Sequence, residues 1–292
     1  MNLFNVISEI EKVDPEFNER ISERRDAIKN ITSFGSKVAI AALPFALGSI
    51  FKKAYAGTAT ATTTSVTDVL NFALTLEYLE SYFYNQGAAS TGLIAAKDAS
   101  YIASITADEN AHVTFLQGVI TQLGGTPVTA PTFDLTAGNG SGAGPFANVL
   151  SNYQTFLAVA ETFEDTGVRA YKGQAPNLLG NQTVLTAALS IHAVEARHAS
   201  AIRYLRTLEY GATVTPWITS TASAANDTGI SQVDANYSGE NNVMQGGVDV
   251  SMLPGAASGT TIGVAAATAA FDEPLDMPTV LSLLSGTFIV VH

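Results

Sequence analysis

The sequence predicts an all-α protein with a four-helix bundle at its centre and an irregular C-terminal extension. Apolar residues recur at the helical period in four stretches, at about residues 66–86, 98–123, 147–172 and 183–209. The loops inside the first pair and inside the second pair are short, whereas a Gly-rich segment at 136–145 separates the two pairs. These lengths predict two antiparallel helix hairpins joined by one long crossover.

The composition is that of a globular protein rich in core residues. Hydrophobic residues make up 47% of the 292 residues and charged residues only 14%, which is too little charge for a disordered chain. The net charge of -12 argues against nucleic acid as a partner. The absence of cysteine excludes disulfides and thiolate metal sites.

Residues 1–56 have the features of an export leader. The stretch "RRDAIK", with Arg24, Arg25 and Lys29, resembles the twin-arginine motif R-R-x-F-L-K, and "AYAG" has the small-residue spacing of a signal-peptidase site. The apolar run at 38–51 rises only about 21 Å as a helix, too little to span a bilayer core. We therefore expect a periplasmic or exported protein whose mature chain begins near Gly57. The alternative is an N-terminal helix and a core segment that are both retained.

The four helical stretches are predicted to occupy residues 57–212 as one domain. Each has an apolar stripe whose members are spaced alternately three and four residues apart, and such positions share one helix face. Gly124 and Gly125 follow the second stretch and Gly211 follows the fourth, as expected of helix C-termini.

Every stripe is apolar at its ends and acidic near its middle. Glutamate interrupts the first stripe at Glu77 and Glu80 and the third at Glu164, and a Glu-x-x-His motif interrupts the second and fourth. The six candidate metal ligands are Glu77, Glu109, His112, Glu164, Glu195 and His198. The spacing in helices one and two recurs almost unchanged in helices three and four, so the bundle contains a two-fold repeat.

Four ionised carboxylates in one core would repel each other and cost several kcal/mol each unless something compensates them. No Lys or Arg stands on the stripes to do so. Two divalent cations would balance the four negative charges, and neutral imidazoles would complete the coordination. Glu109 and Glu195 are then placed to bridge the metals, and Glu77 and Glu164 to cap the two ends. Oxygen-rich ligation with one nitrogen per metal suits iron or manganese.

Residues 65–210 resemble the ferritin-like proteins. The resemblance lies in "LNFALTLEYLESYFY", "DENAHVTFL", "AETFEDTGVRAY" and "VEARHASAIRYL". It is closest to an exported subgroup that also contains desiccation-related proteins. It implies a ferritin-like four-helix bundle with a carboxylate-bridged di-metal centre.

The expected function is that of a di-metal carboxylate protein of the cell envelope. Two iron ions, or alternatively manganese, would react with dioxygen or peroxide in a ferroxidase, peroxidase or catalase-like reaction. The alternative is a structural or desiccation- and stress-related envelope protein in which the metal ions only stabilise the bundle. A homo-oligomer and a contact between the tail and another envelope protein are compatible with both.

For several residues near the six candidate ligands, the sequence leaves two roles open. Glu80 and Glu161 are either additional ligands or helix-face carboxylates that reach solvent or a nearby base. Tyr84 and Tyr171 either contact a ligand, with or without a redox role, or are core aromatics. His192 is expected near the site or at the surface and not as a ligand. The residues next to ligands either orient them or are solvated; they are Asp108, Asp165 and Arg197.

The extension, residues 213–292, is rich in Gly, Ala, Ser and Thr. Residues 219–270 are predicted to be irregular or weakly stranded, because they contain few large apolar groups. A short helix is expected near 278–285, between Pro278 and Gly286, and "TFIVV" at 287–291 predicts a terminal strand or a packed tail. The extension packs either over the bundle or against a partner.

Overall fold

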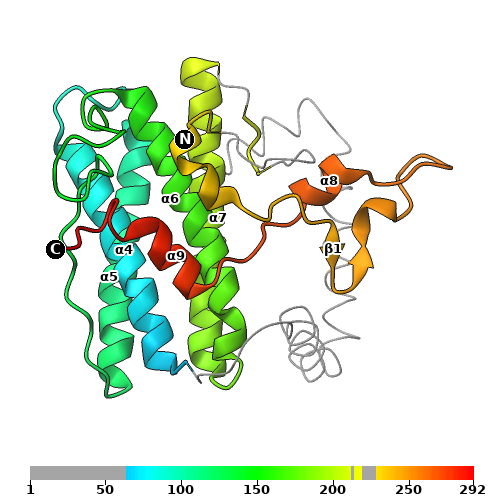
Figure 1. Ribbon diagram of the computed structural model, residues 1–292, viewed down its shortest axis with the longest axis horizontal. Coiled ribbons are helices and arrows are strands. Elements are labelled where there is room, and N and C mark those ends of the chain that lie inside the picture. The colour runs from blue at the N-terminus through cyan, green and yellow to red at the C-terminus, as the bar shows by residue number, and fades with distance from the viewer. Residues whose placement is uncertain (1–63, 212–213, 219–227) are drawn as a thin grey trace, which may run out of the picture. The chain divides into compact units, whose positions relative to one another are not determined.

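Four long helices form the centre of the protein (Figure 1). In this computed structural model the described residues are 64–292 without 212–213 and 219–227, so the predicted leader and its cleavage site lie outside them. The four helices are α4 (Val66–Ala89), α5 (Ala99–Gln122), α6 (Tyr153–Gln174) and α7 (Gln182–Tyr210). The described chain is mostly helical with almost no sheet, which confirms the all-α prediction.

Side-chain caps determine where most of these helices begin. Ser65 and Asp68 form a capping box at the start of α4, and Asn181 caps α7 by accepting from the Val184 amide. The third helix begins at Tyr153 and not at 147 as expected. Residues 147–152 form turns instead, and the side chain of Asn152 then accepts from the Thr155 amide to start the helix.

The helices pair as two antiparallel hairpins, α4 with α5 and α6 with α7. The crossover between the hairpins runs back along the bundle (Figure 1). Its Gly-rich part wraps around Asp134, whose carboxylate accepts from the amides of Gly140 and Gly142 at 2.9 and 3.0 Å. The Asp134 amide in turn donates to the Phe288 carbonyl, so the crossover is fastened to the C-terminal end of the chain.

The rest of the chain consists of short elements. They are η1 (Ala175–Leu178), η2 (Ser231–Tyr237), β1 (Met244–Gln245), β2 (Val248–Asp249), η3 (Val250–Met252), α8 (Val264–Ala269) and α9 (Met277–Leu284). β1 and β2 pair antiparallel. The predicted short helix is α9, which Asp276 caps and whose first turn contains Pro278.

Parts of the C-terminal extension pack over the bundle, namely η2, α9 and the last residues of the chain. Both η2 and α9 contact α6, and Phe288 and Ile289 of the "TFIVV" segment are buried. Ile289 forms only isolated bridges, to Phe133 and Ser285, so this segment is a packed tail and not a strand. Among the described residues, no helix combines the length and the apolarity needed to cross a bilayer.

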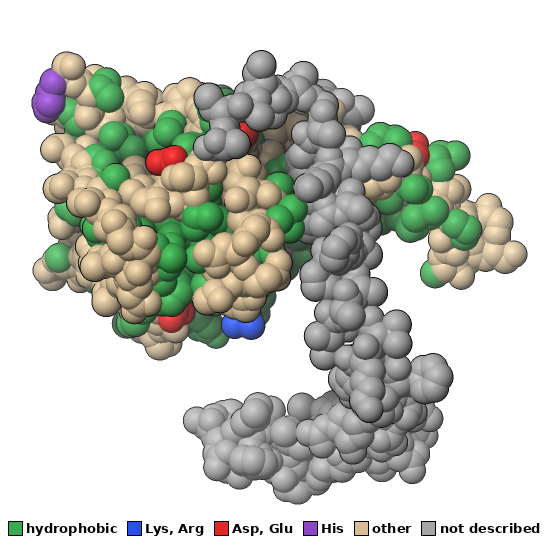
Figure 2. All heavy atoms as spheres, turned by 90° about the horizontal axis from the view of Figure 1, so that it is seen from below, with side chains coloured by type: hydrophobic (Ala, Val, Ile, Leu, Met, Phe, Trp, Pro, Cys, Tyr) green, Lys and Arg blue, Asp and Glu red, His purple; other side chains and the backbone are tan. Residues whose placement is uncertain are grey.

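A polar layer separates two apolar clusters inside the bundle. One cluster includes Phe83, Phe156 and Phe163, and the other includes Leu70 and Leu116. Charged side chains are sparse on the face shown in Figure 2. Much of the acidity of the chain is instead buried in and around the polar layer.

Replacing Gly173 with Ala tests how closely the extension packs on α6. A Cβ atom at residue 173 would lie 1.9 Å from the backbone oxygen of Leu275, so the backbone of one segment would have to move. We expect the Gly173→Ala substitution to lower the free energy of unfolding by about 1–3 kcal/mol, the usual cost of overpacking, measured by denaturant titration.

The matched control is Gly118→Ala in α5, where an added Cβ meets no atom within 4 Å. Its free energy of unfolding should stay the same or rise by up to about 1 kcal/mol, because alanine favours the helix. Equal effects of the two substitutions would contradict the close packing of the extension on α6.

Candidate metal centre

The four long helices each bring one glutamate to the centre of the bundle. Glu77, Glu109, Glu164 and Glu195 are all 0% exposed. Each of them stands where the helical period would otherwise place an apolar residue, so the packing of the four stripes forces the carboxylates together. His112 and His198 lie one turn beyond Glu109 and Glu195 and are also buried.

The carboxylates and imidazoles form two groups that share two members. In the first, single ligand atoms of Glu77, Glu109, His112 and Glu195 lie within 4.8 Å of one another. In the second, Glu164 and His198 replace Glu77 and His112. Glu109 and Glu195 belong to both groups, as expected of carboxylates that bridge two ions.

Both imidazoles turn the same nitrogen toward the carboxylates. His112 Nδ1 lies 3.2 Å from oxygens of Glu77 and Glu109 and 3.1 Å from one of Glu195. His198 Nδ1 lies 2.7 Å from Glu109 Oε1 and 3.4 Å from oxygens of Glu164 and Glu195. The two rings, 6.4 Å apart between centroids, therefore face one common space from opposite hairpins.

Several atoms of this layer are buried, and their contacts of 2.7–3.4 Å with neighbouring ligand atoms do not have the geometry of hydrogen bonds. They are Glu109 Oε1, Glu164 Oε2, both carboxylate oxygens of Glu195, and His198 Nδ1. Buried polar atoms are almost always paired, and a buried charge without a partner is costly. Unpaired oxygen and nitrogen atoms that converge on one space fit a site for divalent cations.

Two tyrosines hold the terminal glutamates from across the bundle. The Tyr84 hydroxyl on α4 donates to Glu164 on α6, and the Tyr171 hydroxyl on α6 donates to Glu77 on α4. Of the two interpretations left open by the sequence, the structure shows contact with a candidate ligand for both tyrosines. The pair follows the internal repeat and leaves the second oxygen of each glutamate facing the centre.

Asp108 contacts the outer nitrogen of one imidazole. Its Oδ2 lies 3.2 Å from His198 Nε2, and its side chain is about half exposed. A hydrogen donated from Nε2 to this carboxylate leaves Nδ1 as the lone-pair nitrogen that faces the cluster. Asp108 also borders a groove of about 540 Å³ between α5 and α7, together with Arg197 and Ser104. The His198 side of the centre therefore has polar side chains beside it, in a groove that apolar residues such as Ile105 and Val194 also line.

Burial and neighbouring charges shift the protonation of the metal-free cluster. Burial raises the pKa of Glu77 to about 7, although His112 acts in the opposite direction. Burial lowers the pKa of the His112 imidazole, but its hydrogen bonds to three glutamates outweigh that effect and raise it to about 12. Without metal ions, the layer therefore retains protons that cations would have to displace.

Glu80 lies beside the centre but in neither group of ligand atoms. It is buried opposite Gly167, where an added Cβ would come within 3.1 Å of Glu80 Oε1. Gly167 follows Glu164 by one turn, as Glu80 follows Glu77, so the repeat is broken to make room for this carboxyl group. Burial and then the charges of the four central glutamates raise the pKa of Glu80 well above its usual range, which favours its protonated form.

Glu161 faces away from the centre into a second charged cluster. Its Oε2 lies 2.6 Å from Arg206 Nη1, and Asp165 Oδ2 lies 2.6 Å from Arg203 Nη2. Arg206 also donates to the Thr228 carbonyl at 2.7 Å. Of the interpretations left open, Glu161 thus pairs with nearby bases, and Asp165 is neither solvated nor directed at a candidate ligand.

Sequence reasoning missed the three arginines of this second cluster, Arg203, Arg206 and Arg169. Among the described residues, Arg169 makes the most contacts with the extension. It is 0% exposed, lies 2.6 Å from Glu240 Oε1, and donates from Nε to the Glu273 carbonyl at 2.6 Å. It also donates to the carbonyls of Asn236 and Ser238. The arginines thus bind the extension to α6 and α7. Their only sequence signal is the spacing of three or four residues that puts acids and bases on facing helix surfaces.

The other residues next to candidate ligands are peripheral. His192 donates from Nδ1 to the Val168 carbonyl at 3.0 Å and belongs to neither ligand group. Arg197 is exposed on the rim of the α5–α7 groove.

Residues 65–208 match the sequence profile of one family, described as the ferritin-like domain. The bundle is a ferritin-like domain. The match begins at the residue that caps α4 and ends in the last turn of α7, so it covers all four helices of the ferritin-like bundle and none of the extension. No curated protein matches the chain. The resemblance to exported and desiccation-related proteins remains a prediction.

Glu77 and Glu161 are both fully buried glutamates in the ferritin-like bundle. Replacing Glu77 should affect metal binding, whereas replacing Glu161 should affect the stability of the metal-free protein. Glu161→Ala removes the partner of a buried arginine, which typically costs about 3–5 kcal/mol of unfolding free energy. Glu77→Ala removes one of the like charges of the central layer. We expect metal content, measured by elemental analysis, to fall only in the Glu77 variant, and the melting temperature of the metal-free protein to fall most in the Glu161 variant. If Glu161→Ala lost metal and Glu77→Ala retained it, Glu161 and not Glu77 would be the metal ligand.

Proposed function

We propose that the ferritin-like bundle holds two iron ions and reacts with dioxygen or hydrogen peroxide. The observation that carries this proposal is the set of buried, unpaired carboxylate and imidazole atoms that converge in the central layer. Two dications would balance the four ionised glutamates, and Glu80 in its protonated form would add no further charge.

The geometry suggests a role for each ligand. Glu109 and Glu195 would bridge the two ions, since both belong to each group. Glu77 and His112 would complete the coordination of one ion, and Glu164 and His198 would complete that of the other. One nitrogen and several oxygens per ion suit iron, and manganese is the alternative.

When bound, two iron(II) ions would supply the two electrons that, with two protons, reduce dioxygen to hydrogen peroxide or hydrogen peroxide to two water molecules. The protein residues orient the ligands and handle the protons. Tyr84 and Tyr171 fix the terminal glutamates, and Asp108 keeps the His198 proton on Nε2. Because Asp108 is half exposed, it also connects the interior to solvent.

We also propose that the protein acts outside the cytoplasm. The support is the twin-arginine-like stretch at Arg24 and Arg25, followed by an apolar run and a small-residue cleavage pattern before Gly57. N-terminal sequencing of the native protein would test this proposal, and a chain that starts at Met1 would contradict cleavage.

Aerobic addition of iron(II) to the metal-free protein tests the redox function. We expect oxidation, followed by absorbance in stopped flow, to be at least tenfold faster than for iron(II) in buffer alone. Glu109→Ala should abolish this acceleration, because it removes a ligand common to both ions. The control is Asn110→Ala, since Asn110 is the exposed neighbour of Glu109 on α5.

Two other results would change the assignment. Tight binding of two ions that raises the melting temperature without any oxidation would assign the site a purely structural role. Unchanged oxidation by Glu109→Ala would remove the proposed centre altogether.

Metal binding should weaken as the pH falls. Ions must displace protons from the central layer, and the raised pKa values of Glu77, about 7, and His112, about 12, mean that protons compete more strongly at lower pH. Each displaced proton changes the affinity about tenfold per pH unit. Calorimetric titrations at pH 6, 7 and 8 in two buffers of different ionisation enthalpy would measure both affinity and proton release. An affinity independent of pH would contradict this prediction.

A further inference from the structure

The two ends of the bundle are related by the internal repeat but are packed differently. At the end near Tyr84, three phenylalanines fill the space between the helices. The Phe83 and Phe156 rings stack at 4.5 Å between centroids, and the Phe163 ring meets Phe83 edge-on at 5.1 Å. Gly87 allows this packing, because a Cβ there would lie 2.3 Å from the Phe156 ring.

At the other end, the repeat places smaller residues in the same positions. When Glu77 is aligned with Glu164, the counterparts of the three phenylalanines are Ala170, Val69 and Leu76. When Glu109 is aligned with Glu195, the counterpart of Ile102 is Ala188. The end near Tyr171 therefore lacks these three rings, although Phe72 and Phe115 stand on its wall where the other end has Val159 and Ala201.

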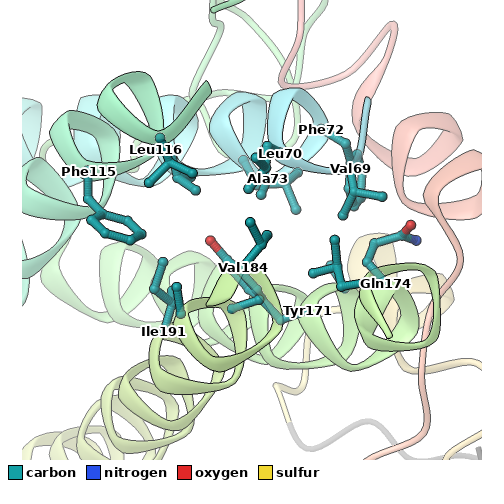
Figure 3. A pocket seen from close by; sticks show the side chains of 16 residues that line it. Val69, Leu70, Phe72, Ala73, Phe115, Leu116, Tyr171, Gln174, Val184 and Ile191 are labelled. Atoms are coloured by element: carbon teal, nitrogen blue, oxygen red, sulfur yellow. The ribbon is translucent and has the colours of Figure 1, made fainter. Parts of the chain in front are cut away.

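A cavity occupies the space that these substitutions leave (Figure 3). Side chains from all four helices line it, and Figure 3 shows Leu70, Leu116, Val184 and Ile191 converging on it. Its free volume is about 20 Å³, and roughly 10–15 Å³ on this scale holds one water-sized molecule. Phe115 on its wall is 44% exposed, so this wall reaches the surface.

The cavity begins next to one half of the metal centre. Three of its lining residues, Ala73, Leu116 and Ile191, lie four residues from Glu77, His112 and Glu195. Residues four apart on a helix are neighbours on one face. Tyr171, another lining residue, donates to Glu77 itself.

The lining offers almost nothing to a polar guest. Of the residues that line the cavity, only Tyr171 and Gln174 have polar side chains. The Tyr171 hydroxyl is committed to Glu77, and the Gln174 oxygen accepts from Asn177 at 2.9 Å, so the Gln174 NH2 group is the one polar group of the lining left for a guest. Apolar cavities of this kind stay dry and take up small apolar molecules.

We infer that this cavity binds dioxygen and conducts it to the Glu77–His112 side of the centre. This inference rests on the proposed function. Of the two oxidants proposed there, dioxygen is the one that would reach the centre through the cavity. Dioxygen is apolar and of the right size, whereas water and hydrogen peroxide need hydrogen-bond partners. At the other side of the centre, the groove between α5 and α7 offers such partners in the side chains of Asp108 and His198.

Xenon binding tests the cavity without any metal or turnover. We expect metal-free crystals under xenon pressure to show xenon between Ala73, Tyr171 and Ala188. The Ala188→Ile variant, which copies the packed end of the bundle, should exclude it, and Val69→Phe is a second filling variant should Ala188→Ile fail to fold. The matched control is Ala103→Ile on the exposed side of α5, which should bind xenon like the unchanged protein.

Stopped-flow oxidation of the iron(II)-loaded protein then tests the route. Ala188→Ile should slow oxidation by dioxygen at least threefold and change oxidation by hydrogen peroxide less than twofold. No xenon in the cavity, displacement of xenon by a larger hydrocarbon such as hexane, or an unchanged dioxygen rate in Ala188→Ile would each overturn the inference. If xenon binds but neither oxidant reacts with the loaded protein, the proposed function fails and the dioxygen route fails with it.

Discussion

Four fully buried carboxylates in one layer cannot all remain ionised without compensating charge, and the structure of this protein is organised around that constraint. One glutamate comes from each long helix, and all four are fully buried. Imidazoles meet them from α5 and α7, and tyrosines reach across to the two terminal glutamates. Unpaired atoms remain at the centre, which is the arrangement that two divalent cations would complete.

The protein compensates its buried acids in two different ways. Among the residues that the structure describes, no arginine or lysine pairs with the four carboxylates of the central layer. On the outer side of α6 and α7, Glu161 and Asp165 are matched by Arg206 and Arg203, and Arg169 binds the extension through its carbonyl groups. The first layer is suited to exchangeable cations, and the second joins the extension to the bundle through contacts between protein groups.

The candidate ligands are the same at equivalent positions of the two helix hairpins, but the residues around them differ. Asp108 supports His198, whereas Val194 stands at the equivalent position of the other hairpin. Phenylalanines fill one end of the bundle, and a small apolar cavity remains at the other. A duplicated helix hairpin would thus hold two similar ions while its two sides admit polar and apolar molecules separately.

Local patterns along the chain were sufficient to predict the helices and the residues that meet at the centre. These patterns are short-range features: the helical period, the capping residues and the repeated Glu-x-x-His spacing. They are enough to place Glu77, Glu109, Glu164 and Glu195 on the inward faces of their helices. The start of α6 was placed too early, because apolar residues before Asn152 continue the helical pattern although they form turns.

Only the tertiary structure decided the roles that depend on contacts distant in the sequence. Glu80 and Glu161 lie at similar spacings from central ligands, yet one faces Gly167 and the other faces Arg206. The burial of Arg169 depends on the extension about 70 to 100 residues further along the chain, and the cavity depends on which side chains from four helices meet. Helical periodicity defines the face on which a residue lies, but its partner is defined by packing between segments that the local sequence does not relate.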